Sequence, residues 1–297
     1  MPPKEEISKW FRNLQLHICS ELEKEDGVGK FVEDTWERPG GGGGHTRVIQ
    51  HGQVFEKGGV NFSAVHGKLS PNIVKALELP SDGFYATGVS IVIHPINPFV
   101  PIIHMNVRYF EMEDGKYWFG GGIDLTPHYV IDKDAQYFHS ALKQTCDRFD
   151  SNYYPDFKKW ADDYFFIKHR NETRGVGGIF FDRLKENEKM SKADIWSFVQ
   201  GVGETFAPTY RHIVASNKNK SFTEENTLWR NLRRGRYVEF NLVYDKGTKF
   251  GLETDGRIES ILMSLPEQAS WFYNFQPTVD GDEERTISRL VKGLNWV

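Results

Sequence analysis

The chain has 297 residues, with 37 Lys and Arg against 41 Asp and Glu, and 39% of it is hydrophobic. This length admits one large domain or two, and the composition supports a sizeable core. The net charge of -4 argues against nucleic acid as the main partner, because a phosphate-binding surface usually carries a basic excess. Any anionic ligand must therefore be held by local arginines.

Two cysteines, Cys19 and Cys146, are too few for a disulfide scaffold and indicate a reducing compartment. The residues from Met1 to Glu6 lack the apolar run of a signal peptide and the composition of a transit peptide, so the expected location is the cytoplasm. No run of 18 apolar residues occurs, and no membrane-spanning helix is predicted.

The first elements follow from simple periodicities. Apolar residues recur at helical spacing between residues 4 and 26 and predict an amphipathic helix. The five glycines Gly40 to Gly44 predict a loop, since glycine loses the most backbone entropy when it is ordered. Strand patterns follow over 46–67, 87–94 and 102–112, and the last of these closes in a hairpin.

Helical spacing returns between residues 135 and 167. Ser191 and Asp194 then resemble an N-terminal capping box and open another helix. The last helix is expected to carry Ile287 and Leu290.

Late strands are predicted over 237–244, where polar and apolar residues alternate, and near 249–252. Strands early, helices in the middle and strands again late favour an α+β fold over repeated βαβ units. We expect a large, mainly antiparallel β-sheet flanked by α-helices, in a single domain over residues 1–297.

The strand that begins at Ile102 has an unusual polar face. Alternation places His104, Asn106 and Arg108 on one side and apolar residues on the other. A solvated outer face is also polar, but such faces usually hold Thr, Lys and Glu. We therefore favour a functional role for these three residues.

Asp124 lies on the return strand of the hairpin, and its face depends on the loop. A two-residue loop at Asp114 and Gly115 pairs Asp124 with the apolar Met105. A three-residue loop with Gly115 in the left-handed conformation pairs it with His104. We choose the second, because it keeps a carboxylate off an apolar face.

Four histidines offer a metal site as an alternative: His94, His104, His139 and His169. Their spacing matches no ligand motif. A buried, hydrogen-bonded histidine explains His94 equally well.

Four longer strings closely resemble oxygen-dependent coproporphyrinogen III oxidase, and the likeness extends from Trp36 through Trp271. The strings are His104 to Glu111, Gly120 to Pro127, Lys168 to Asp182, and Tyr237 to Pro266. The resemblance implies oxidative decarboxylation of two propionates of coproporphyrinogen III to vinyl groups, giving protoporphyrinogen IX in haem biosynthesis. It also implies a homodimer. Because a porphyrinogen is already electron-rich, we expect dioxygen as co-substrate and neither metal nor organic cofactor.

The resemblance also implies roles for single residues. His104 matches the family's proposed proton donor, Asp124 an aspartate proposed to sit at the pyrrole nitrogens, and His169 a histidine linked to dimer integrity. Further residues match substrate contacts: Ser90, Asn106, Val107, Arg108, Asp255, Gly256 and Arg257. Two alternatives stay open, a tetrapyrrole carrier without turnover and a histidine-ligated metal oxygenase.

Overall fold

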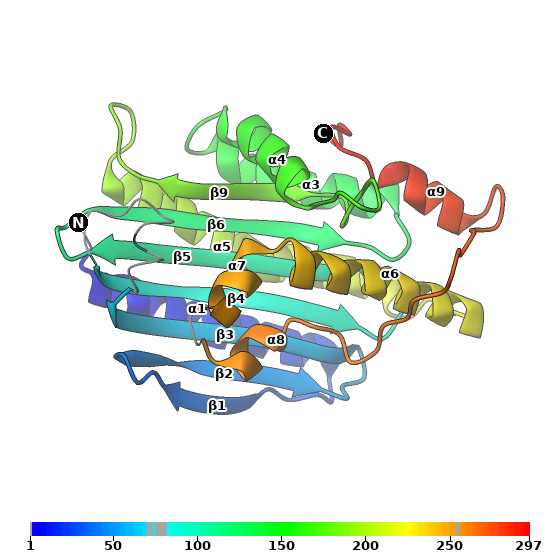
Figure 1. The fold of residues 1–297 in the computed structure, drawn as a ribbon. Coiled ribbons are helices and arrows are strands. Elements are labelled where there is room, and N and C mark those ends of the chain that lie inside the picture. Colours follow the sequence, from blue (N-terminus) through cyan, green and yellow to red (C-terminus); the bar gives the residue numbers. More distant parts are fainter. Residues whose placement is uncertain (1, 70–73, 75–81, 254–255) are drawn as a thin grey trace.

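A computed structural model gives the structure of the chain and describes residues 2–69, 74, 82–253 and 256–297. Its centre is a seven-stranded sheet with the order β1-β2-β3-β4-β5-β6-β9, in which every neighbouring pair is antiparallel (Figure 1). The expected α+β fold with a large antiparallel sheet is confirmed. The strands are β1 (Val32–Glu37), β2 (Gly42–Gln50), β3 (Phe55–Lys68), β4 (Gly83–Pro95), β5 (Ile102–Met112), β6 (Tyr117–Thr126) and β9 (Gly178–Leu184).

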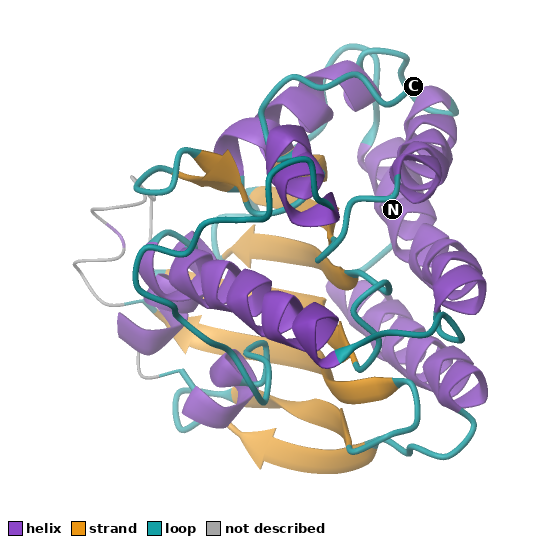
Figure 2. Ribbon diagram, turned by 90° about the vertical axis from the view of Figure 1, so that its right-hand side faces the viewer, coloured by secondary structure: helices purple, strands orange, loops and turns teal. Residues whose placement is uncertain are grey.

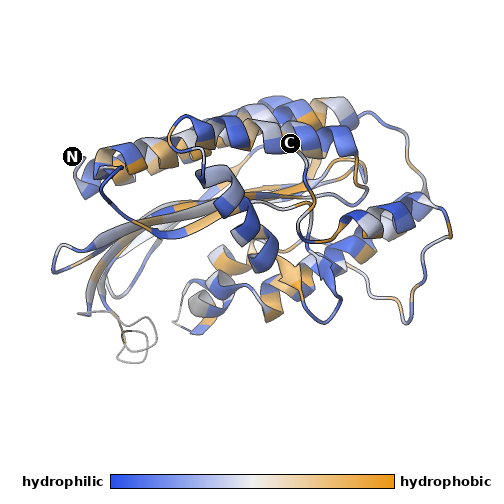
Figure 3. Ribbon diagram, turned by 90° about the horizontal axis from the view of Figure 1, so that it is seen from above, coloured by the Kyte–Doolittle hydropathy of each residue, from blue (hydrophilic) through white to orange (hydrophobic). Residues whose placement is uncertain are grey.

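Helices cover both faces of this sheet, so the molecule has three layers (Figures 2 and 3). One face carries α1 (Lys4–Asp26), α3 (Asp132–Asp147), α4 (Tyr153–Tyr164) and α5 (Lys192–Asn217). The other carries α6 (Glu224–Val243), α7 (Lys246–Glu253) and α8 (Ile258–Leu262). A short second sheet pairs β7 (Phe166–Ile167) with β8 (Glu172–Thr173), and α9 (Asp282–Arg289) lies near the C-terminal end. Among the described residues, no helix combines the length and hydropathy that crossing a membrane requires.

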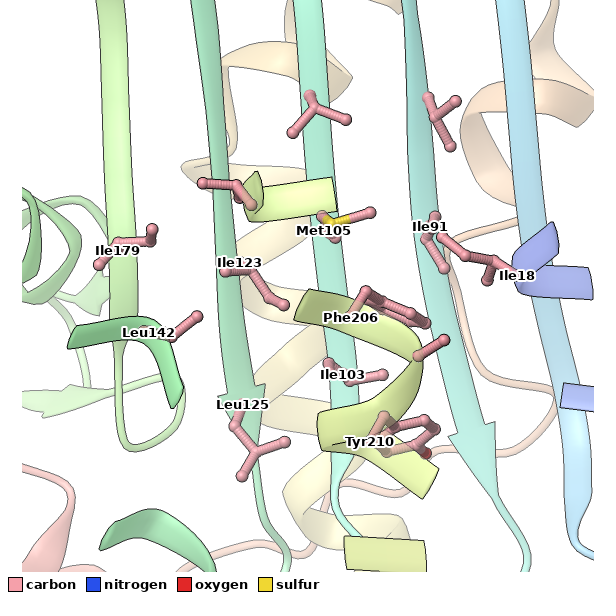
Figure 4. Packing of buried hydrophobic residues seen from close by; sticks show 14 of the residues in the cluster. Ile18, Ile91, Ile103, Met105, Ile123, Leu125, Leu142, Ile179, Phe206 and Tyr210 are labelled. Atoms are coloured by element: carbon pink, nitrogen blue, oxygen red, sulfur yellow. The ribbon is translucent and has the colours of Figure 1, made fainter. Parts of the chain in front are cut away.

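The apolar core lies between the sheet and the layer of α1, α3 and α5 (Figure 4). Ile103 and Met105 of β5 point toward Phe206 and Tyr210 of α5. Burying a side chain of this size contributes about 1.5–3 kcal/mol. The largest cluster of buried apolar residues draws on the chain from its first helix to its C-terminal end, as expected for a single domain.

The hairpin between β5 and β6 has the three-residue loop predicted from the sequence. The Met112 N–H donates to the Lys116 carbonyl oxygen at 2.7 Å, and Gly115 is left-handed with φ 83. His104 consequently pairs with Asp124 in the ladder. The choice of the longer loop is confirmed, and it brings the two residues together.

The loop predicted for Gly40–Gly44 is wrong for its second half, because β2 begins at Gly42. A Cβ on Gly43 would lie 2.2 Å from the Trp36 carbonyl oxygen, and one on Gly44 would lie 2.4 Å from the Phe62 carbonyl oxygen. These glycines allow a close approach of neighbouring strands, which offsets their entropy cost.

The two late strands are also wrong, since residues 237–244 fall in α6 and its cap and 249–252 in α7. The buried residues of α6 include an unbroken run from Trp229 to Tyr237, and many of them are polar, among them Arg230, Arg233, Arg234 and Asn241. A helix that buries arginines has a weak hydrophobic period, so the local alternation after Tyr237 was misleading.

Asp26 fastens the end of α1 to the turn between β2 and β3. Its carboxylate accepts hydrogen bonds from the N–H groups of Gly29, Gln53, Val54 and Phe55 at 2.6 to 2.9 Å. Burial alone would raise the pKa of Asp26, but these backbone N–H groups outweigh it and lower that pKa. The ionised carboxylate is thus the form that stabilises the fold.

We predict that Asp26→Asn lowers the free energy of unfolding near neutral pH by about 2 kcal/mol or more, because buried amides lose a charged acceptor. Since the folded pKa is lowered, this contribution is present above the usual aspartate pKa and is lost as pH falls through the folded value. Urea unfolding of parent and variant across this range measures it. Glu188→Gln, at an exposed position, is the control and should change little; equal stability of Asp26→Asn and parent near neutral pH would contradict the prediction.

Candidate active site

A polar face on the central strands carries several of the predicted site residues. His104, Asn106 and Arg108 are partly exposed on β5, while Ile103, Met105 and other alternate residues are fully buried on the opposite face. Ser90 on β4 pairs directly with Asn106. The predicted division of β5 into two faces is confirmed. Val107 lies on the apolar face with its side chain in the core, which leaves only its backbone for a substrate contact.

His104 and Asp124 form a hydrogen-bonded pair on this face. Nδ1 of His104 lies 2.8 Å from Oδ1 of Asp124. The His104 side chain is 20% exposed, whereas that of Asp124 is 1% exposed. The imidazole therefore stands between the carboxylate and solvent.

Behind this pair lies Arg174, which the sequence analysis did not identify. Its Nη2 donates to both oxygens of Asp124 at 2.8 Å, and its Nη1 donates to Oδ1 of Asn241 at 3.1 Å. The guanidinium also stacks on three aromatic rings, with 4.3 Å to the ring centre of Phe165 and 4.9 Å to that of Tyr237. Burial alone would raise the pKa of Asp124, but the charge of Arg174 and the His104 hydrogen bond outweigh it and hold that pKa below its usual range.

Arg108 is held by two polar neighbours. Its guanidinium donates to Oδ1 of Asn106 and to Oδ1 of Asp182 on β9, both at 2.8 Å. The ion pair crosses β6 above Gly120, where a Cβ would lie 2.6 Å from Asp182 Oδ1. A register shift between β6 and β9 accompanies a left-handed Arg183, next to Asp182. Bulges often redirect side chains beside functional sites. Asp182 is the second residue of this site that the sequence analysis missed.

Arg257 approaches the same face from the other edge of the sheet. It occupies the N-cap position of α8, donates to Ser260 Oγ and forms an ion pair with Asp34 of β1. Ser260 Oγ in turn lies 2.7 Å from Thr46 Oγ1 of β2. Gly256 precedes it, with its N–H donating to the Gly251 carbonyl oxygen. Asp255, the third predicted residue of this turn, lies outside the described residues.

His169 is separate from these residues and lies at the surface near α6. Its Nε2 lies 2.6 Å from a Glu239 carboxylate oxygen and its Nδ1 2.8 Å from the Tyr244 hydroxyl. Arg170 binds the same carboxylate of Glu239. The structure thus places His169 in a surface ion-pair network and not with His104.

The four histidines considered for a metal site do not converge. His94 is buried against the Ser264 carbonyl oxygen, as the simpler explanation had it, and His139 is buried between the Tyr154 hydroxyl and the Val176 carbonyl oxygen. Within the part of the chain that the structure describes, no three His, Cys, Asp or Glu residues are grouped as metal ligands.

Comparison with known proteins identifies the family of the chain. The family model for coproporphyrinogen III oxidase matches residues 6–296. The chain belongs to the coproporphyrinogen III oxidase family. Oxygen-dependent coproporphyrinogen-III oxidase of Drosophila melanogaster is 50% identical over 96% of this chain and 76% of its own length. The mitochondrial protein of Rattus norvegicus is 50% identical over 99% and 69%, and the chloroplastic protein of Glycine max 46% over 98% and 79%.

We predict that Asp124→Asn lowers kcat by about 100-fold or more, the usual scale for a positioned acid–base group. It should also lower the free energy of unfolding by about 3 kcal/mol, because it leaves Arg174 as an unpaired buried charge. Steady-state kinetics and urea unfolding measure the two effects.

The control is Asp162→Asn, another buried aspartate, whose carboxylate accepts from Lys158 and from the Gly293 N–H. This variant should lose stability while kcat stays near the parent value. Near-normal turnover of Asp124→Asn would exclude a part for this carboxylate in the reaction.

Proposed function

We propose that the chain is an oxygen-dependent coproporphyrinogen III oxidase that converts two propionates of its substrate to vinyl groups and yields protoporphyrinogen IX for haem biosynthesis. The observation that carries the proposal is the pairing of His104 with a buried aspartate on a face flanked by Arg108 and Arg257. Family membership over nearly the whole chain supports the same reaction.

The reaction requires that the substrate be oriented and that proton transfer be controlled. In each propionate arm the carboxyl group leaves as CO2. A hydrogen leaves the carbon next to the pyrrole ring together with its bonding electrons, and dioxygen accepts these electrons. The electron-rich pyrrole favours this loss, so we propose that dioxygen is the co-substrate and that the chain uses no cofactor. His104 is placed to exchange a proton with the substrate, since its ring is partly exposed on the polar face.

Arg108 and Arg257 are spaced to hold different carboxylates of one substrate. Arg257 lies over β2 through Ser260, and Arg108 belongs to β5. Three strand spacings separate β2 from β5, or about 14 Å. The residues between them on this face are small, with Ser63 paired to Gly88 and Asn61 paired to Ser90. A flat macrocycle with propionate arms fits such a surface.

We predict that Arg108→Lys and Arg257→Lys each lower kcat/KM by at least about tenfold, roughly 1.4 kcal/mol, because lysine loses the fork that matches a carboxylate. Steady-state kinetics with coproporphyrinogen III measures this. Arg289→Lys is the control, since Arg289 pairs with Asp132 away from the polar face. Parent-like kinetics of both site variants would refute the arginine clamp.

We predict that the protein, dialysed against a strong chelator, forms protoporphyrinogen IX from coproporphyrinogen III under air and not under argon. Fluorescence of the oxidised products, separated by chromatography, measures it. Binding without product under air would indicate a tetrapyrrole carrier. Activity that vanished on chelation and returned with one divalent ion would indicate a metal oxygenase.

The homodimer is likewise a proposal, and an exposed aromatic surface beside α6 supports it. This surface consists of Trp271, Phe272, Tyr273 and Phe275. Trp271 donates to Glu239, the same carboxylate that binds His169 and Arg170. Exposed aromatic groups of this extent commonly mark an interface. Glu239 connects this aromatic surface to His169, and the family resemblance implies a part in dimer integrity for that histidine.

We predict that light scattering at micromolar concentration gives about twice the chain mass of 34.3 kDa. Phe272→Glu combined with Tyr273→Glu should halve that mass, because charges would enter an apolar contact. Val28→Glu, at an exposed valine after α1, should stay dimeric. A monomeric parent with full activity would contradict the dimer, and a dimeric double variant would exclude this surface.

The cytoplasmic location stays a prediction. Residues Lys4–Asp26 form α1, whose apolar side is buried in the core. The named relatives include chloroplastic and mitochondrial proteins. Microscopy of the tagged protein in its own cells tests the location.

A further inference from the structure

Both oxygens of Asp124 are hydrogen-bonded within the protein and enclosed. Oδ1 accepts from His104 and from Arg174, and Oδ2 accepts from Arg174, all at 2.8 Å. The side chain is 1% exposed. A pyrrole N–H would reach this carboxylate only after His104 moved aside or the ion pair with Arg174 opened.

Arg174 is equally enclosed, and it is fixed from several sides. Its side chain is 2% exposed and stacks on rings of α6 and of the segment after α4. Asn241 of α6 accepts from its second terminal nitrogen. Such a cation cannot reach a propionate, in contrast to the partly exposed Arg108 and Arg257.

The orientation of His104 follows from these contacts. An ionised Asp124 accepts hydrogen bonds only, so the Nδ1 that faces it must carry a proton. The lone pair of the neutral ring is then on Nε2. The ring edge rests on Phe165, with centroids 6.1 Å apart, and this contact limits rotation.

We propose that Arg174 is a positioning residue that keeps Asp124 ionised, so that Asp124 acts through His104 and the Nε2 atom of His104 is the group that meets the substrate. This inference rests on the proposed function and departs from the direct contact with pyrrole nitrogens implied for Asp124. In the reaction Nε2 accepts the proton of a pyrrole N–H, the imidazolium is stabilised by Asp124, and the proton returns to that nitrogen after the hydride has passed to dioxygen and CO2 has left.

Other titratable groups face this pair from neighbouring elements. They are His94 of β4, Tyr164 of α4, Tyr237 of α6 and Asp245 after α6. Burial lowers the pKa of His94 well below its usual range and raises the pKa of Tyr237 to about 12, so both stay neutral near pH 7. The Asp245 carboxylate accepts from the Tyr164 hydroxyl and from Thr248. The cation in direct contact with Asp124 is Arg174.

The first test is made on the unmodified protein without substrate. Nitrogen-15 NMR of the histidine rings, with His104 assigned by substitution, should show a proton on Nδ1 and a bare Nε2 at a pH where the ring is neutral. A proton on Nε2 instead would overturn the proposal. Because no turnover is needed, failure of this test and failure of the proposed oxidase activity are distinguishable.

The second test uses Arg174→Gln and Arg174→Lys. Loss of the cation should lower kcat by at least about tenfold with KM changed less than about twofold, because Arg174 does not touch substrate. Removing a positive charge eases protonation of the His104 and Asp124 pair, so the limb of the kcat profile that this pair sets should move to higher pH. The lysine variant keeps the charge and should recover part of kcat and the parent profile.

Arg233 supplies a matched control, since it is also buried, pairs with Glu172 at 2.9 Å and stacks on Trp229. Arg233→Gln should lose stability but keep the parent kcat and pH profile. A raised KM with unchanged kcat in Arg174→Gln, or a parent-like pH profile, would overturn the proposal. If Arg174→Gln does not fold, the lysine variant and the NMR test on the parent still decide it.

Discussion

The buried ion pair between Asp124 and Arg174 is the constraint around which the functional face of the sheet is built. A helix can cover a polar sheet face only if each buried charge meets a partner, because an unpaired one costs several kcal/mol. α6 meets this condition by contributing Arg233 and Arg234, which pair with Glu172 and Glu56. The opposite face is covered mainly by apolar side chains, and a buried polar group there such as Gln15 of α1 binds backbone carbonyl oxygens of the sheet. The two helical layers are therefore held to the sheet by different interactions, one largely by paired buried charges and the other mainly by apolar packing.

This difference explains which elements could be predicted from the sequence. The apolar layer and the hairpin of β5 and β6 depend on local signals, namely periodicity, alternation and a glycine in the loop, and these predictions were correct. α6 was missed because arginine and asparagine occupy its inward positions, which no hydrophobic period reveals. Gly42 to Gly44 were missed because the reason for them is the carbonyl oxygens of neighbouring strands, which the sequence does not display.

The site shows the same division. His104 and Asp124 could be paired in advance, because the register of one hairpin brings them together. Arg174 lies 50 residues from Asp124 and Asp182 lies 74 from Arg108, so neither contact has a local signal. Arg174 follows a charged stretch after α4, and such stretches commonly just complement a helix dipole. Only the packing of α6 and β9 onto the hairpin distinguishes Arg174 from the other charged residues of this stretch.

Exposure then distinguishes the arginines that can bind substrate from those that cannot. The side chains of Arg108 and Arg257 are 35% and 28% exposed, and their partners Asp182 and Asp34 are similarly or more exposed. Ion pairs in such positions contribute only about 0–1 kcal/mol. A propionate that displaces either aspartate therefore meets little resistance and gains the same fork of donors. Arg174 is enclosed by three aromatic rings. To bind a propionate it would have to give up its buried ion pair with Asp124. Arginine thus has two roles. At the open face Arg108 and Arg257 can exchange an aspartate partner for a propionate, and beneath that face Arg174 is a permanent counter-charge for Asp124.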